Sequence, residues 1–326
     1  MRAWRFSEFG DIKNFQLGEH PEPDLENGDL LIKLNFAALN PADRLLVEGR
    51  YPGAGELPLT VGRDGSGTIE DAKGSDRFAN GDTVIVLRSE VGITRQGTLA
   101  EYVAVPERYL APLPEGWTME EGAAGPLVYL TAWKALKIQG GVQAGEDVLV
   151  TGASGGVGVA AIQLAKALGA RVVALSRDEE KRQKLLALGA DVVLDSSAAD
   201  LEDQIRDASD GGVDLIVENL SGPFIQTGIN VANLNARIMV IGLLAGPVAE
   251  IQLGLVLFKQ VRIEGVHVGK FLPAEATAAW HDIVQTLEGA GAKPLVDRVF
   301  PMEEVQEAFT HLAGGHLGKV LVNVAG

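Results

Sequence analysis

Short apolar runs separated by turn residues dominate the first 115 or so residues of the chain. Examples are residues 30–34, 83–87 and 102–105, and the segments between them contain clusters of Gly, Pro, Asn and Asp. Runs of this length between turn-forming residues are typical of β-strands. The pattern therefore predicts a β-rich N-terminal region without long helices.

The pattern changes at Thr118, which has the spacing of a helix capping box with Glu121 and predicts a helix from about Met119. From Glu146 onward, continuous β-branched runs alternate with helical patterns, which is typical of a parallel sheet covered on both faces. After Val268 we expect one or two helices and a final strand at 319–322. The other predicted strands are 147–151, 171–175, 192–194, 215–217, 238–241 and 262–266, and the helices are 156–168 and 179–188.

A glycine-rich loop follows the strand at 147–151 and opens the next helix. It runs from Gly152 to Gly158 with the sequence Gly-Ala-Ser-Gly-Gly-Val-Gly. Glycines in this position let the backbone approach a pyrophosphate, and the helix N-terminus offers unpaired N–H groups and a partial positive charge. The context predicts a dinucleotide site; the alternative is a tight strand–helix turn that binds no ligand.

Composition narrows the possible partners. The 326 residues include 28 basic and 44 acidic side chains, for a net charge of −16, which disfavours binding to nucleic acid or anionic membranes. The chain has no cysteine, and its longest apolar stretch, 238–249, is too short and too interrupted to cross a membrane. No signal peptide is visible in the first ten residues. We therefore expect a cytoplasmic protein.

The segment 145–166, which contains the glycine loop, resembles the signature of the zinc-independent quinone oxidoreductase (zeta-crystallin-like) branch of the medium-chain dehydrogenases/reductases. The segments 40–43 (Asn-Pro-Ala-Asp), 62–67 (Gly-Arg-Asp-Gly-Ser-Gly) and 189–191 (Gly-Ala-Asp) fit the same family. The resemblance implies an α/β fold in which a doubly wound parallel Rossmann sheet is inserted into a GroES-like β-barrel catalytic domain. The expected domains are 1–121 with 268–326, and 122–267.

The residues after the second Rossmann strand bear on the cofactor. In NAD-binding units an acidic residue ends this strand and binds the ribose hydroxyls. Here the strand is followed by Ser176 and Arg177, the acid is displaced to Asp178, and Lys181 follows one helical turn later. A hydroxyl beside two cations suits the extra phosphate of NADPH. We therefore expect NADPH; the alternative is a solvated helix start of mixed charge.

The resemblance implies further cofactor contacts, most of them where parallel strands end. Relatives often place a tyrosine near the adenine, and this chain has Asp195 and Ser196 there. The full expected set is Asn40, Thr131, Gly152, Ser154, Gly155, Gly156, Val157, Gly158, Ser176, Arg177, Lys181, Asn219, Gly242, Leu243, Val268, Gly269 and Lys319. Lys319 is expected to reach the cofactor phosphates; the alternative is a solvated surface lysine.

No metal is expected. Zinc-dependent relatives supply catalytic ligands at positions that correspond by resemblance to Asn40, Arg63 and Leu127, and none of these is a usual zinc ligand. The five histidines are scattered along the chain. The chemistry is therefore expected to proceed without a Lewis acid.

The resemblance places Asn40, Asp43, Tyr51 and Arg63 as the catalytic candidates. Tyr51 matches a family tyrosine that faces the substrate, and it could donate a hydrogen bond to a carbonyl oxygen as negative charge develops. Asp43 is expected to orient Asn40 or to pair with Arg44 or Arg63, and Arg63 could instead pair with Asp64. A second family tyrosine is replaced by Leu45.

These observations predict hydride transfer from NADPH to a quinone. One alternative is reduction of an enone, alkenal or acrylyl-thioester double bond. Another is a non-catalytic NADPH-binding protein of the crystallin or sensor type. The apolar stretch 251–258 precedes the last Rossmann strand, and relatives pair through that edge, so we also expect a homodimer.

Overall fold

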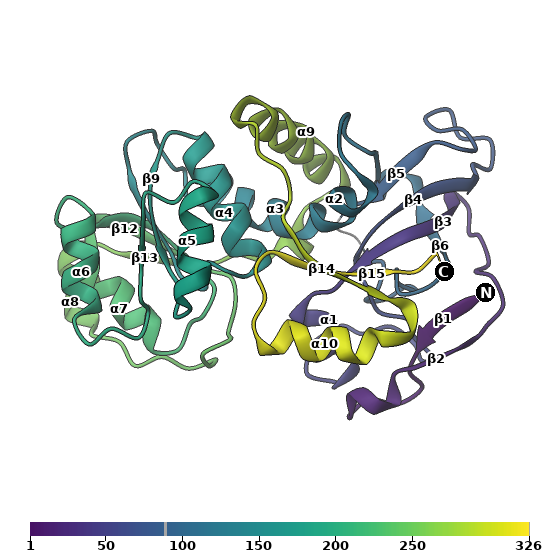
Figure 1. The fold of residues 1–326 in the computed structure, drawn as a ribbon, viewed down its shortest axis with the longest axis horizontal. Coiled ribbons are helices and arrows are strands. Elements are labelled where there is room, and N and C mark those ends of the chain that lie inside the picture. The colour runs from purple at the N-terminus through teal and green to yellow at the C-terminus, as the bar shows by residue number, and fades with distance from the viewer. Residues whose placement is uncertain (88–89, 326) are drawn as a thin grey trace. The chain divides into compact units, whose positions relative to one another are not determined.

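Two units divide the chain in the computed structural model, which describes residues 1–87 and 90–325. Unit 1 comprises Met1–Leu127, Phe271–Trp280 and Lys293–Gly326, and unit 2 comprises Val128–Lys270 and His281–Ala292. Helix α9 (Pro273–Ala290) contributes to both units, which the sequence did not predict. Each unit is described by itself below (Figure 1).

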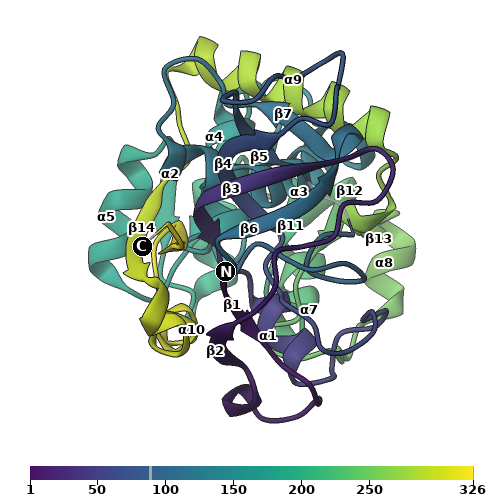
Figure 2. The ribbon, with the colours of Figure 1, turned by 90° about the vertical axis from the view of Figure 1, so that its right-hand side faces the viewer.

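Unit 1 is built around a sheet with strand order β14-β15-β3-β4-β5-β7. Its long strand β3 pairs along one edge with β4, while its other edge pairs first with β6 and then with β15. Residues of β3, β4, β6 and β15 share one apolar core, as expected of a GroES-like fold. Figure 2 shows β3, β4 and β5 side by side.

The elements of unit 1 are β1 (Arg2–Arg5), β2 (Gln16–Glu19), β3 (Asp29–Ala38), α1 (Pro41–Val47), β4 (Asp64–Asp71), β5 (Thr83–Val86), β6 (Tyr102–Pro106), β7 (Leu110–Pro112), α2 (Met119–Ala124), β14 (Val296–Pro301), α10 (Val305–Gly314) and β15 (Lys319–Asn323). Thr118 caps α2 in the predicted capping box with Glu121. The core inside the sheet includes Phe6, Phe15 and Phe309.

Unit 2 contains a six-stranded parallel sheet with strand order β10-β9-β8-β11-β12-β13. Its elements are α3 (Pro126–Trp133, of which Val128 onward lies in this unit), a π-helix at Lys134–Gln139, β8 (Asp147–Val150), α4 (Gly156–Ala167), β9 (Arg171–Leu175), α5 (Glu179–Ala187), β10 (Val192–Leu194), α6 (Leu201–Ala208), β11 (Val213–Glu218), α7 (Pro223–Val231), β12 (Ala232–Val240), α8 (Leu253–Lys259) and β13 (Arg262–Gly265).

The strand order shows why this sheet is covered on both faces. The chain moves from β8 to β10 in one direction through α4 and α5, and from β10 through β11 to β13 in the other direction through α6, α7 and α8. Because crossovers between parallel strands are right-handed, the reversal places the two helix groups on opposite faces. Leu201, Ile205, Ile225 and Ile229 of α6 and α7 pack on the second face. The predicted doubly wound α/β fold is therefore confirmed.

One expectation for the C-terminal part was wrong. A single final strand was predicted, but β14 precedes β15 and pairs with it in parallel. Most side chains of β14 are exposed, so the segment carries no apolar run that could have revealed a strand. Helix α1 was also missed, since its seven residues are too few to display a helical period.

Among the described residues, no helix is both long enough and apolar enough to cross a membrane.

Candidate functional site

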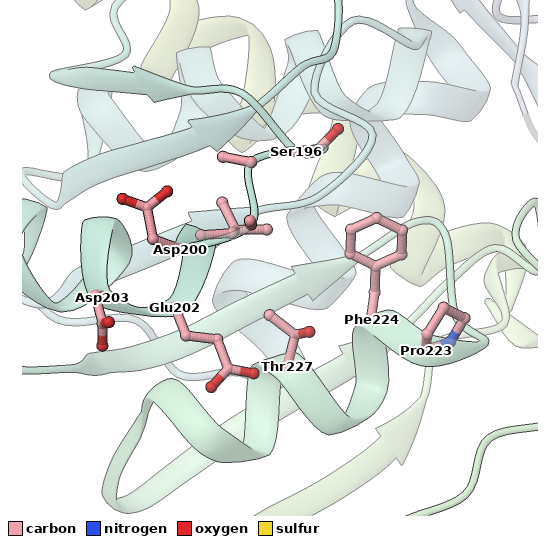
Figure 3. A pocket seen from close by; sticks show the side chains of 10 residues that line it. Ser196, Asp200, Glu202, Asp203, Pro223, Phe224 and Thr227 are labelled. Atoms are coloured by element: carbon pink, nitrogen blue, oxygen red, sulfur yellow. The ribbon is translucent and has the colours of Figure 1, made fainter.

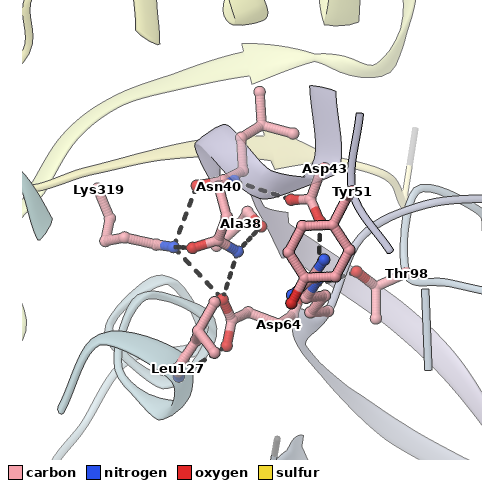
Figure 4. A network of polar contacts seen from close by, with 10 residues as sticks. Ala38, Asn40, Asp43, Tyr51, Asp64, Thr98, Leu127 and Lys319 are labelled. Atoms are coloured by element: carbon pink, nitrogen blue, oxygen red, sulfur yellow. Dashed lines mark hydrogen bonds and ion pairs between the residues drawn. The ribbon is translucent and has the colours of Figure 1, made fainter. Parts of the chain in front are cut away.

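A buried polar cluster in unit 1 joins Asn40, Asp64 and Lys319 (Figure 4). The ammonium group of Lys319 donates to Asn40 Oδ1 at 2.7 Å and to the Leu39 carbonyl at 3.1 Å, and it lies 3.3 Å from Asp64 Oδ2. Asn40 Nδ2 donates to Asp64 Oδ2 at 2.9 Å, and the Leu127 amide donates to Asp64 Oδ1 at 2.9 Å. Each member therefore satisfies the others in a region shielded from water.

The cluster shows that Lys319 is a buried lysine and not a solvated one. Its side chain is only 5% exposed, and each of its three N–H groups already has an acceptor or an ion-pair partner within unit 1. In this arrangement the ammonium group binds oxygens of the protein, and its contact with the cofactor phosphates stays a prediction. The amide of Asn40 is likewise occupied by Lys319 and Asp64, so its side chain holds the cluster together.

A second polar group joins the buried Asp43 and Arg63 to the partly exposed Tyr51. Asp43 Oδ2 accepts a hydrogen bond from the Asn40 backbone amide at 2.8 Å, and its Oδ1 lies 3.3 Å from Arg63 Nε. Arg63 Nη1 donates to Tyr51 Oη at 3.2 Å, and the guanidinium carbon lies 4.4 Å from the centre of the Tyr51 ring. Burial raises the pKa of Asp43, and the charges of Arg63 and Lys319 oppose that rise.

These contacts decide between the alternatives left open by the sequence. Asp43 both orients Asn40 and pairs with Arg63, whereas Arg44 pairs with Glu48. Arg63 contacts Asp43 and Tyr51, while the neighbouring Asp64 belongs to the Lys319 cluster. Four charged side chains are thus arranged as two ion pairs with no net formal charge.

The glycine loop of unit 2 has the geometry that phosphate binding requires. Gly152 has φ +55°, a conformation that favours glycine, and a Cβ on Gly158 would lie 2.6 Å from the backbone of Ala153. Gly155 is the N-cap of α4, and no side chain caps the helix. The N–H groups of its first turn, from Gly156 to Gly158, therefore have no intrahelical acceptor and suit an anion. These residues fit a dinucleotide pyrophosphate.

The end of β9 lacks a free carboxylate. Ser176 is buried and Arg177 is exposed, while Asp178 is the N-cap of α5 and accepts a hydrogen bond from the Lys181 amide at 3.0 Å. The backbone hydrogen bond from Lys181 lowers the pKa of Asp178. Since this acid already caps the helix, the groups that remain for a ligand here are a hydroxyl and two cations, which fit a ribose phosphate.

Sequence reasoning missed a carboxylate beneath the glycine loop. Glu218 ends β11 and is fully buried, and its Oε1 accepts hydrogen bonds from Thr151 Oγ1 at 2.6 Å and from the amides of Leu220 and Ser221. Asn219 is tied to Thr151 by two hydrogen bonds. Burial raises the pKa of Glu218. An acid directly after an apolar strand was the available signal.

The remaining expected cofactor residues all belong to unit 2. Thr131 is buried on α3. Gly242 follows β12 and is packed so closely that a Cβ added to it would lie 2.3 Å from the Asn219 carbonyl. Leu243 is 56% exposed, so it has apolar surface to offer a ligand. Ser154 and Val157 lie in the glycine loop and the first turn of α4, and Val268 and Gly269 lie in a short 3-10 helix after β13.

One pocket of about 390 Å³ lies in unit 2 between the segment after β10 and the start of α7 (Figure 3). Phe224 and Ser196 line it together with three acidic residues, Asp200, Glu202 and Asp203. None of the expected cofactor residues lines it. Carboxylates repel phosphates, so this pocket does not fit the charged part of a dinucleotide.

Comparison with known proteins places the chain in a family. Family profiles described as "Alcohol dehydrogenase GroES-like domain" and "Zinc-binding dehydrogenase" match residues 26–115 and 156–289. A quinone oxidoreductase of Rattus norvegicus is 31% identical over 327 residues, which cover 99% of this chain and 97% of that protein. The chain belongs to the quinone oxidoreductase family of medium-chain dehydrogenases/reductases.

Solved structures support this assignment. A protein described as an NAD-dependent alcohol dehydrogenase is 31% identical with a TM-score of 0.90. The match covers 99% of this chain and 100% of that chain. A mycobacterial protein complexed with NADPH is 25% identical with a TM-score of 0.89 and the same coverage. The two descriptions name different cofactors, so the choice for this member of the quinone oxidoreductase family depends on its own residues.

Metal binding also has to be judged from this chain's own residues, although one matching family profile is named after zinc. In this quinone oxidoreductase family member, Asn40 and Arg63 are engaged in the two clusters described above, and the Leu127 backbone binds Asp64. Within residues 1–87 and 90–325, no group of three His, Asp or Glu side chains is arranged to hold a metal ion.

Proposed function

We propose that the chain is an NADPH-dependent, zinc-independent oxidoreductase that transfers a hydride to a quinone. The observation that carries the cofactor choice is the role of Asp178 as the N-cap of α5, which leaves Ser176, Arg177 and Lys181 at the end of β9. NAD-binding units need a free acid there to bind the ribose hydroxyls, whereas two cations and a hydroxyl attract the additional phosphate of NADPH. When bound, NADPH supplies the hydride.

In this proposal unit 2 binds and orients the cofactor. The first-turn amides of α4 and the partial positive charge of its N-terminus hold the pyrophosphate. Glu218 fixes the turn that carries Asn219, and Thr151 ties that turn to the glycine loop. Thr131, Gly242, Leu243, Val268 and Gly269 are proposed to line the rest of the cofactor.

Unit 1 is proposed to act on the hydride acceptor. Hydride addition places negative charge on a carbonyl oxygen, which a hydrogen-bond donor stabilises. Tyr51 is the proposed donor because its side chain is partly exposed, whereas Asn40, Asp43 and Arg63 are all buried. The buried three are proposed to support the loop that carries Tyr51.

A second candidate reaction is reduction of an enone, alkenal or acrylyl thioester. Leu45 stands where relatives have a second tyrosine, so the proposed site offers Tyr51 as a single hydroxyl donor. A quinone has two carbonyl oxygens, whereas an enone has one. A single hydrogen-bond donor is therefore sufficient for an enone. This observation keeps the double-bond reductase as the alternative.

The test is NADPH oxidation by the purified protein against a panel of quinones and enones. Turnover of quinones above enones supports the proposal, and the reverse order supports the alternative. Tight NADPH binding without oxidation by any acceptor would show a non-catalytic NADPH-binding protein.

We also propose a homodimer formed through β13, the strand at one edge of the parallel sheet. The preceding helix α8 exposes Leu253, Leu257 and Phe258 at 70%, 70% and 80%. Pairing two copies would cover both the apolar helix face and the open strand edge. Light scattering at micromolar concentration should give the dimer mass. Leu257→Glu should give the monomer, and Leu186→Glu on α5 is the control.

A further inference from the structure

Arg63 is almost completely buried, and its hydrogen bonds are incomplete. Its side chain is 3% exposed, and Nη1 donates to Tyr51 Oη. Nε faces Asp43 Oδ1 at 3.3 Å as an ion pair without hydrogen-bond geometry, and Nη2 has no acceptor. A buried N–H without an acceptor is unfavourable and uncommon, so the guanidinium orientation that serves Tyr51 needs an explanation.

The chemistry of the two side chains fixes the direction of their hydrogen bond. A guanidinium group has donors only, so the Tyr51 oxygen must be the acceptor. The hydroxyl hydrogen of Tyr51 is then directed away from Arg63, and among the described residues it has no hydrogen-bond acceptor. Contact between the guanidinium group and the ring face restrains the tyrosine in this position.

Asp43 in turn restrains Arg63. Its carboxylate faces Nε, which leaves Nη1 to bind Tyr51, and its own position is fixed by the Asn40 amide. The pair is formally neutral, so it adds no net charge next to Tyr51. A site of this kind suits an acceptor that arrives as a neutral carbonyl and gains negative charge only during the reaction.

We propose that Asp43 and Arg63 are positioning residues that keep the Tyr51 hydroxyl oriented as a hydrogen-bond donor toward a neutral carbonyl oxygen. The proposal rests on the proposed reductase function and adds the acceptor class and the role of Arg63. If Arg63 only neutralised Asp43, any cation at this place would be equivalent. If Arg63 positions Tyr51, both the planar guanidinium group and its contact with the tyrosine ring are required, and a lysine supplies neither.

The test is a double-mutant cycle with Arg63→Lys and Tyr51→Phe, using protein saturated with NADPH. Arg63→Lys should lower kcat about tenfold, the effect of one lost hydrogen bond, and should add nothing to the loss in Tyr51→Phe. NADPH affinity should remain constant in all variants. The control is Arg50→Lys, because Arg50 is 70% exposed and pairs with Glu48. The proposal would be overturned if Arg63→Lys kept the wild-type kcat, or if the kcat losses of the two single variants added in the double variant.

Two further measurements separate this inference from the proposed reaction and from misfolding. Binding of 4-nitrophenolate to the protein with NADP⁺ mimics a charged carbonyl oxygen, and its affinity should fall in both single variants without adding in the double variant. If 4-nitrophenolate binding behaves in this way but the protein reduces no acceptor, the reductase function is refuted and the positioning role of Asp43 and Arg63 is retained. If Arg63→Lys does not fold, the double variant Asp43→Asn with Arg63→Gln is the substitute, because it removes both charges. This double variant should lower kcat in the wild-type background but not in the Tyr51→Phe background. A loss of kcat that persists in the Tyr51→Phe background would contradict the proposal.

Discussion

The polar cluster of unit 1 and the glycine loop of unit 2 use their polar groups in opposite ways. Asn40, Asp64 and Lys319 satisfy one another in the interior, so they hold a shape and have little left for a ligand. The first turn of α4 has no side-chain cap, and Arg177 is exposed. A motif that binds through the backbone can therefore be recognised locally, whereas the role of a charged side chain depends on what folds around it.

The largest expected effect concerns stability and tests whether Lys319 is structural. Lys319→Met leaves Asp64 buried without its cation, which should destabilise the protein by about 3–5 kcal/mol in urea unfolding. The control is Lys73→Met, since Lys73 and Asp71 form an exposed pair whose loss should leave the stability nearly unchanged. If Lys319→Met kept its stability but lost NADPH affinity, the lysine would belong to the cofactor site after all.

The glycine loop should be sensitive to a single methyl group. Gly158→Ala places a Cβ against the Ala153 backbone, so the loop must shift and NADPH affinity should fall at least about tenfold, or 1.4 kcal/mol. Gly289→Ala in α9 is the matched control, because nothing lies within 4 Å of its Cβ. NADPH titration measures both. An affinity within about twofold of the parent protein would mean that the loop does not hold the pyrophosphate.

Asp178 offers a smaller effect that separates capping from cofactor binding. Asp178→Ala removes the side-chain cap of α5 and should lower the stability of the protein while leaving NADH affinity unchanged. Asp200→Ala is the control, since Asp200 occupies the N-cap of α6 without a capping hydrogen bond. A selective loss of NADH affinity in Asp178→Ala would assign the acid to the ribose.

Chelation should have no effect. Activity in excess EDTA should equal untreated activity because Asn40, Arg63 and Leu127, which by resemblance correspond to the zinc ligands of relatives, are not usual zinc ligands. Metal analysis by mass spectrometry accompanies the assay. Stoichiometric zinc together with loss of turnover on chelation would refute the metal-free account.

Much of the fold could be predicted because its signals are local. The β-branched runs of unit 2 and the capping box at Thr118 each lie within a few residues, and so does the glycine loop. Strand β14 gave no such signal, since its side chains are mostly exposed and its place depends on pairing with β15.

The unit 1 site could be predicted only in part. Asn40, Asp43, Tyr51 and Arg63 were identified from family resemblance, but Lys319 is 279 residues away from Asn40 and 255 away from Asp64. A lysine is rarely buried, so the sequence favoured a solvent-facing or phosphate-facing role. Only the folded chain shows that Asp64 and Lys319 compensate each other.

In the proposed division of labour, unit 2 selects NADPH and unit 1 polarises the hydride acceptor. The most direct test measures NADPH affinity and kcat at saturating NADPH in two variants. Arg177→Ala with Lys181→Ala should weaken NADPH by about 1.5–3 kcal/mol or more, leave NADH binding unchanged and keep kcat. Tyr51→Phe should lower kcat about 10²-fold and keep NADPH affinity. If NADPH and NADH weaken equally in the first variant, or if kcat stays within about twofold of the parent value in the second, the division of labour is contradicted.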